Sequence, residues 1–135
     1  YVKEVKDNGK VDLYAPPANF STREDLNHVT PPQFKGKLPE GLKKGDMVML
    51  EKNRLTVLDE ACIREISRYE SWGFRRGTVS YVNNKGKNLM RIQSSGLRVW
   101  FAPPENITLK HKNREVIYFP VIIDNIPMAK YVQLL

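Results

Sequence analysis

The sequence has little of the chemistry on which most enzymes and metal sites depend. Its 135 residues include one cysteine, Cys62, and two histidines, His28 and His111. A single thiol excludes an intramolecular disulfide and fits a reducing compartment, so we expect the protein in the cytoplasm. Neither histidine belongs to a nucleophile motif, and one cysteine with two separated histidines does not make a zinc site. We therefore predict that the protein is not an enzyme and needs no cofactor.

Long apolar runs are also missing. No stretch approaches the ~18 apolar residues that a membrane-spanning helix requires, and the start of the chain does not resemble a secretory signal. We therefore expect no membrane partner. The chain begins with Tyr1 rather than Met, so we expect it to be a piece of a longer protein. With 41% hydrophobic residues it has enough apolar surface to bury a core, and it is predicted to be globular.

Acidic residues are scarce in one region. The formal net charge is +7, and between Ser71 and Arg114 there are nine basic residues and one acidic residue, Glu105. The remainder of the chain carries slightly more acidic than basic charge. A region of this kind is typical of proteins that bind polyanions such as nucleic acids.

The pattern of residues predicts a mainly β fold. β-branched and aromatic residues alternate with polar ones between turns rich in Asn, Ser and Gly, and a Pro-Pro pair at 103–104 must interrupt the sheet. The predicted strands cover residues 44–50, 76–82, 87–93, 97–102 and 106–110. Asn8-Gly9 favours a tight turn and hence an N-terminal hairpin. A second hairpin is predicted for the C-terminus, from Glu115 onward.

A helix is predicted over residues 56–71, between the first two of those strands. Thr56 can cap its start, and apolar residues recur at helical spacing to make one stripe that we expect to be buried. The stripe consists of Leu58, Cys62, Ile66 and Tyr69, with Ile63 beside them.

The order of strands resembles that of the KOW and Tudor-like branch of SH3-like barrels. The residues that carry the resemblance are Gly45, Asp46, Val48, Gly77, Val79, Val82, Met90, Ile92, Val99, Trp100, Asn106, Ile107 and Thr108. The resemblance covers residues 43–110, about half the chain, and implies a small five-stranded barrel with an inserted helix. The insertion itself departs from the family, whose first two strands are joined by a brief loop.

The chain is therefore predicted to have three parts. Residues 1–42 hold the N-terminal hairpin and a Pro-rich connection, residues 43–110 the barrel with its helix, and residues 111–135 a C-terminal hairpin. We expect the C-terminal hairpin to pack on the barrel and to join the N-terminal hairpin in a small sheet.

One face of the predicted barrel carries the candidate binding site. If Met90 and Ile92 point inward, strand alternation turns Arg91 outward, and the same argument places Trp100 beside it. Cationic side chains neutralise phosphates, and an exposed indole can stack on a base. The predicted nucleic-acid-binding residues are Arg75, Arg76, Lys85, Lys87, Arg91, Arg98, Trp100, Lys110, Lys112 and Arg114.

The predicted function is non-enzymatic binding of nucleic acid through its phosphate backbone. The sequence offers no recognition helix, so binding should be weakly sequence-selective. Double-stranded DNA is favoured over RNA as the partner. The chain is also similar in character to the DNA-binding transcription modifiers of T-even phages. That resemblance implies modulation of transcription or nucleoid organisation in the host cytoplasm or nucleoid, with host nucleoid or transcription proteins as further partners.

The same residues are also compatible with other functions. One is an RNA- or ribosome-associated KOW factor. Another is a Tudor-like protein-interaction module, in which the aromatic residues dock a protein and the charge serves solubility. A third is an aromatic cage for methylated lysine built from Tyr81 and Trp72. The simplest is a solvated face with Trp100 partly covered by the C-terminal hairpin.

Overall fold

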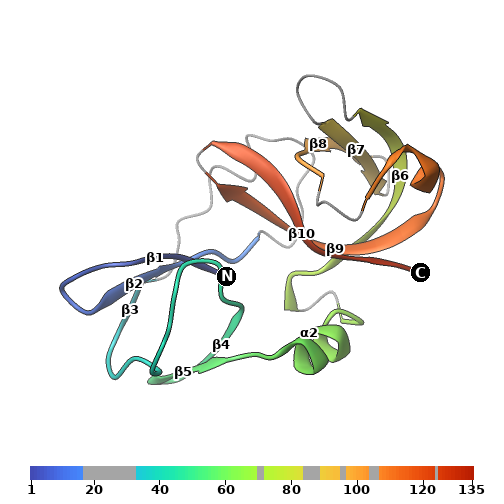
Figure 1. The fold of residues 1–135 in the computed structure, drawn as a ribbon. Helices are drawn as coiled ribbons and strands as arrows, with labels where there is room; N and C mark the ends of the chain where they lie inside the picture. Colours follow the sequence, from blue (N-terminus) through green and yellow to red (C-terminus); the bar gives the residue numbers. More distant parts are fainter. Residues whose placement is uncertain (17–32, 70–71, 84–88, 95–96, 104–106, 124) are drawn as a thin grey trace. The chain divides into compact units, whose positions relative to one another are not determined.

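The computed structural model describes residues 1–16, 33–69, 72–83, 89–94, 97–103, 107–123 and 125–135, with the backbone alone at residues 94, 97–99 and 123. The fold is mainly β, and the described strands form several sheets and no closed barrel. The chain divides into two compact units. Unit 1 comprises Tyr1–Ala15 and Val29–Ile66, and unit 2 comprises Pro16–His28 and Ser67–Leu135 (Figure 1). No helix in the described ranges is long and apolar enough to cross a membrane.

Unit 1 contains five short strands in two antiparallel sheets. The first sheet has the order β1-β2-β3, and the second is the hairpin β4-β5. The strands are β1 (Val2–Val5), β2 (Lys10–Leu13), β3 (Gln33–Lys35), β4 (Val48–Glu51) and β5 (Arg54–Val57). The predicted N-terminal hairpin is confirmed, and Gly9 takes the positive φ (+80°) that its turn requires. Strand β3 lies in the Pro-rich connection, where no strand was predicted.

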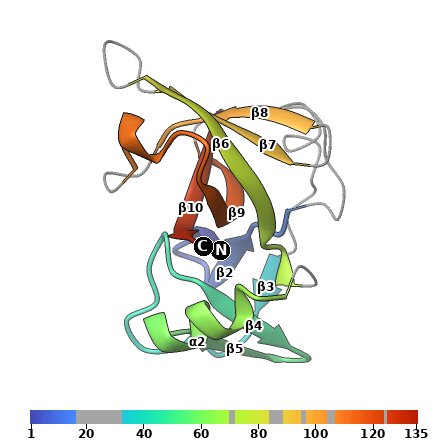
Figure 2. The same cartoon turned by 90° about the vertical axis from the view of Figure 1, so that its right-hand side faces the viewer.

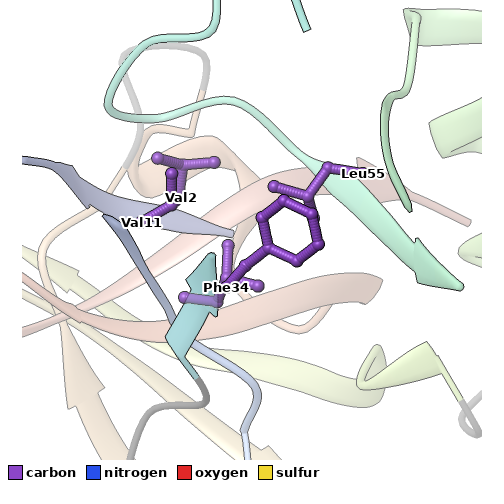
Figure 3. Close-up of a cluster of buried hydrophobic side chains, with 5 residues drawn as sticks. Val2, Val11, Phe34 and Leu55 are labelled. Atoms are coloured by element: carbon purple, nitrogen blue, oxygen red, sulfur yellow. The ribbon is translucent and has the colours of Figure 1, made fainter. Parts of the chain in front are cut away.

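Side chains from both sheets meet in the core of unit 1. Figure 3 shows Val2, Val11, Phe34 and Leu55 converging from β1, β2, β3 and β5. Each of the four is at most 5% exposed. The Val2 amide donates to the Asp46 carbonyl (2.8 Å), so β1 is also bonded to the chain that leads into β4. The two small sheets therefore bury their apolar faces against one another.

The helix of unit 1 is shorter than predicted. It is α2 (Glu60–Ile66), and Arg54–Val57 forms strand β5 instead of the expected helix start. Asp59 caps the helix, since the Cys62 amide donates to its Oδ1 (2.8 Å). In so short a helix the buried position is Ile63, whereas Cys62 is exposed. The prediction that Cys62 lies in a buried stripe is therefore wrong.

Unit 2 contains a five-stranded sheet with the order β10-β9-β6-β7-β8, and its neighbouring strands are antiparallel. The strands are β6 (Arg75–Asn83), β7 (Leu89–Ser94), β8 (Leu97–Phe101), β9 (Glu115–Ile123) and β10 (Ile126–Leu134). After the meander of β6, β7 and β8, the chain returns to place β9 beside β6, which is a Greek key (Figure 2). Ala102, the residue after β8, forms an isolated parallel bridge with Met128 of β10.

Several features of unit 2 differ from the expected barrel. The strand predicted over residues 44–50 pairs with β5 in unit 1 and not with β6, because the Greek key gives that edge of β6 to β9. Where a last barrel strand was predicted, Leu109–His111 forms a 3-10 helix, η2. His111 closes this turn by accepting the Thr108 N–H at its Nδ1 (2.9 Å). The C-terminal hairpin is confirmed as β9 and β10, but it shares no sheet with the N-terminal hairpin.

Aromatic packing fills the core of unit 2. Phe74 meets Phe119 and Phe101 meets Tyr118, both edge to face, with ring centroids 5.2 and 5.4 Å apart. Pro120 is tolerated in β9 because β6 pairs with that strand only as far as Tyr118. At Pro120 the ladder therefore needs no amide donor on that side.

Candidate nucleic-acid interface

Three side chains from neighbouring strands form a row on the outer face of the unit 2 sheet. Tyr81 of β6 lies opposite Arg91 of β7, and Arg91 lies opposite Trp100 of β8. Tyr81 is 41% and Trp100 42% exposed, and Arg91 is half-buried. We call these three residues the aromatic row. Directly opposed residues have Cβ atoms about 4.5–5.5 Å apart, so one ligand can touch neighbouring members of the row.

Contacts among its members hold the aromatic row together. The Tyr81 and Trp100 rings meet edge to face with centroids 5.8 Å apart, and Arg91 Cζ lies 5.4 Å from the Trp100 ring centroid. Arg91 Nε donates to Ser80 Oγ (2.9 Å), and that hydroxyl donates to the Arg91 carbonyl (3.1 Å). These bonds position the guanidinium through Nε. Its two terminal nitrogens, which suit phosphate, are not needed to hold the side chain.

A β-bulge in β6 creates the aromatic row. The register with β7 shifts between Val79 and Tyr81, so that Tyr81 lies opposite Arg91 and Ser80 is the extra residue. Val79 and Val82 are both buried although they are three residues apart. Strict alternation would place one of the two valines on the solvent face. The bulge instead keeps both inside and turns Tyr81 outward.

The inner face of the same strands is apolar. Met90, Ile92 and Phe101 are each at most 1% exposed. The alternation predicted from the sequence is therefore confirmed for Met90 and Ile92. It is confirmed as well for Trp100, which is exposed rather than covered by the C-terminal hairpin.

A basic stretch, residues 110–114, runs along β6 on the side away from β7. We call it the basic segment. The Asn113 amide donates to the Val79 carbonyl (2.6 Å), and the Val79 amide donates to the Arg114 carbonyl (3.0 Å). Since Val79 directly precedes the bulge, the basic segment lies next to the aromatic row along β6. Its three exposed predicted site residues are Lys110, Lys112 and Arg114.

The other predicted residues are not gathered in the same place. Arg75 and Arg76 lie at the start of β6, opposite Tyr118 and Ile117 of β9. At about 3.3 Å per residue, Arg76 is roughly 16 Å from Tyr81 along the strand. Lys85 and Lys87 lie outside the described residues, as does the side chain of Arg98.

The electrostatic surroundings of the aromatic row are cationic. In the described part of unit 2 the basic side chains outnumber the acidic ones, and Glu115 is the one carboxylate among them. A methyl-lysine cage benefits from a nearby acidic group. Because the described surroundings of the aromatic row are cationic, this surface is poorly suited to a cationic ligand. Tyr81 moreover makes its ring contact with Trp100, whereas the predicted cage paired it with Trp72.

The described ranges contain no group of three or more His, Cys, Asp or Glu side chains that could hold a metal ion. His111 uses its Nδ1 to cap η2 and so serves the fold. Asp59 hydrogen-bonds the exposed Cys62 and raises the pKa of that thiol, which makes it a weaker nucleophile at neutral pH.

Sequence reasoning missed Tyr81 as a member of this site. The clue was present in Val79-Ser80-Tyr81-Val82, where two valines three residues apart within a strand cannot share a face without a bulge.

Comparison with protein-family models, curated proteins and solved structures gives no match to this chain.

Proposed function

We propose that the protein binds nucleic acid without enzymatic activity, and that unit 2 supplies the binding surface. The observation that carries this proposal is the exposed aromatic row with the basic segment beside it. Exposed cations neutralise phosphates and release condensed counterions, which makes the affinity strongly dependent on salt. The binding is mainly to the backbone and weakly selective for sequence, and double-stranded DNA is favoured over folded RNA.

The strand order lends further support. A three-strand meander, a fourth strand beside the first, and a last strand parallel to the third make the order of the five-stranded Greek-key barrels that bind oligonucleotides on the face of their second and third strands. In this protein those two strands correspond to β7 and β8, which carry Arg91 and Trp100. The resemblance to KOW and Tudor-like barrels remains a proposal for the meander of β6, β7 and β8.

The biological setting is also proposed. A basic protein that coats DNA with little sequence preference competes with nucleoid proteins, and through them alters transcription. The resemblance to phage transcription modifiers points the same way. An RNA- or ribosome-associated role and a protein-docking role are the alternatives. Titrations with duplex DNA, single strand and folded RNA separate them from the proposed function.

Charge reversal tests the proposal. Lys112→Glu with Arg114→Glu removes two exposed cations of the basic segment. In a fluorescence-anisotropy titration of a labelled duplex of about 30 base pairs at several salt concentrations, we expect about a 100-fold loss of affinity near 0.1 M salt. The slope of log K against log salt should fall by about two.

The matched control is Lys37→Glu with Lys44→Glu, two exposed lysines of unit 1 that change the net charge equally. It should leave the slope unchanged. Equal losses in both variants would mean that only overall charge matters, and no binding to duplex, single strand or folded RNA at low salt would refute the proposal. Tighter binding to folded RNA at matched salt would favour the RNA alternative.

A further inference from the structure

The aromatic row has two exposed rings, and phosphate binding does not require them. The backbone of a fully paired duplex presents charge, and cations alone satisfy it, whereas the faces of paired bases are covered by stacking. Tyr81 and Trp100 nevertheless each leave about two fifths of their surface open to solvent, and their rings adjoin one another. Adjoining exposed rings form an apolar patch of the kind that marks a binding surface, and a flat aromatic ligand would cover it.

The geometry of the aromatic row suits such a face. Tyr81 and Trp100 come from β6 and β8, with Arg91 of the intervening strand between them in register. The Arg91 guanidinium lies against the indole and is fixed by Ser80, so a cation and two rings are held together before any ligand arrives. A nucleotide can then place its base on a ring and its phosphate near the guanidinium or the basic segment.

We propose that the aromatic row binds unpaired nucleobases, so that the protein holds single-stranded nucleic acid, or a melted tract within a duplex, more tightly than a fully paired duplex. This inference rests on the proposed function and narrows it to a ligand class. Phosphate contacts from the basic segment supply the salt-dependent part of the affinity. Stacking on Trp100 and Tyr81 supplies a part that depends little on salt.

The test compares three labelled ligands at matched salt: a duplex, the same duplex with about six unpaired nucleotides at its centre, and the single strand. Wild-type protein should prefer the last two. Trp100→Ala should weaken binding to them by about 5- to 150-fold, the range for loss of one stacking contact. Its effect on duplex binding should stay within about twofold, and the salt slope should not change.

Trp72 provides the matched control. It is 46% exposed in the same unit but lies outside the aromatic row, so Trp72→Ala should leave all three affinities unchanged. Trp100→Phe should restore most of the lost binding, because phenylalanine still stacks. Running the single-strand arm as DNA and as RNA shows which sugar is preferred.

A second measurement does not depend on the alanine variant folding. In Trp72→Phe the remaining tryptophan is Trp100, and its fluorescence should be quenched as the single strand binds. In Trp100→Phe the remaining Trp72 should report no quenching.

Equal weakening of all three ligands by Trp100→Ala, or quenching of Trp72 alone, would overturn the inference. Tight duplex binding without preference for unpaired bases would also overturn it while leaving the proposed function standing. No binding of any ligand would remove both.

Discussion

The two units of this protein carry their charges differently. Unit 1 has ten basic and nine acidic residues, whereas unit 2 has twelve basic and six acidic. The described ion pairs, Lys6–Asp12, Lys43–Asp46 and Arg64–Glu60, all belong to unit 1. In unit 2 the exposed cations flank exposed aromatic rings. Balanced charges serve the solubility and local order of a fold, while an excess of one sign beside rings that can stack is what the proposed binding surface requires.

The two units can differ in role only if each has its own core. Substitutions in the two cores test this and have the largest expected effect. Phe34→Ala removes a buried ring of unit 1 and should cost about 3–5 kcal/mol of the free energy of unfolding. Phe101→Ala should do the same in unit 2. Hydrogen exchange resolved by mass spectrometry should show each loss of protection confined to the unit that carries the substitution. Loss spread evenly over both units would break the distinction.

Gly73 gives a smaller effect, confined to unit 2. Its φ is +93°, and an added Cβ would lie 2.9 Å from both the Phe119 ring and Pro16. Gly73→Ala should therefore destabilise unit 2 by about 2–4 kcal/mol, measured by urea unfolding followed by tryptophan fluorescence. Gly41 of unit 1 has a similar φ (+77°) but open space around it, so Gly41→Ala should cost only about 1 kcal/mol in that unit. Equal costs would mean that the close packing at Gly73 contributes nothing.

The smallest effect concerns the paired charges of unit 1. Asp12 accepts a hydrogen bond from Gln33 (2.9 Å) and pairs with Lys6 (3.2 Å), and these two partners lower its pKa. Because the folded pKa is below the unfolded value, the contribution to stability is present at neutral pH and is lost as pH falls through the folded pKa.

Asp12→Asn should therefore lower the stability of unit 1 by at most about 1 kcal/mol at neutral pH and by nothing at a pH well below the folded pKa of Asp12. Unfolding followed by hydrogen exchange at the two pH values measures this. Glu60→Gln is the control, since its pair with Arg64 is long (3.9 Å) and exposed, and it should change nothing at either pH. A difference between Asp12→Asn and wild type that persists at low pH would contradict the assignment.

Local patterns in the sequence predicted local structure well. The Asn8-Gly9 turn, the alternation of Met90 and Ile92, and the two terminal hairpins needed only neighbouring residues. The partners of the strands were not predictable in the same way. Strand β4 was predicted to be the first strand of a barrel, yet it pairs with β5. The reason is that Leu55 of β5 alternates with exposed residues, as in a strand, and is buried in the core of unit 1.

The candidate site shows the same division. Arg91 and Trp100 could be placed on one face from strand period alone, whereas Tyr81 joined them only through a bulge. Asn113 and Arg114 reach the edge of β6 through backbone bonds to Val79, which lies 34 and 35 residues earlier in the chain, and they bring Lys112 with them. Contacts over such separations depend on the whole fold, which a short pattern cannot specify.

The exposed thiol of Cys62 and the two tryptophans give the molecule two independent optical reporters. Cys62 is the one cysteine of the chain and belongs to unit 1, while both tryptophans belong to unit 2. A maleimide dye attached at mildly alkaline pH, where the raised pKa of the thiol is overcome, would report on the charge-balanced unit alone. Selective excitation of tryptophan would report on the basic one. Ligand binding and the unfolding of each unit can thus be followed in a single sample.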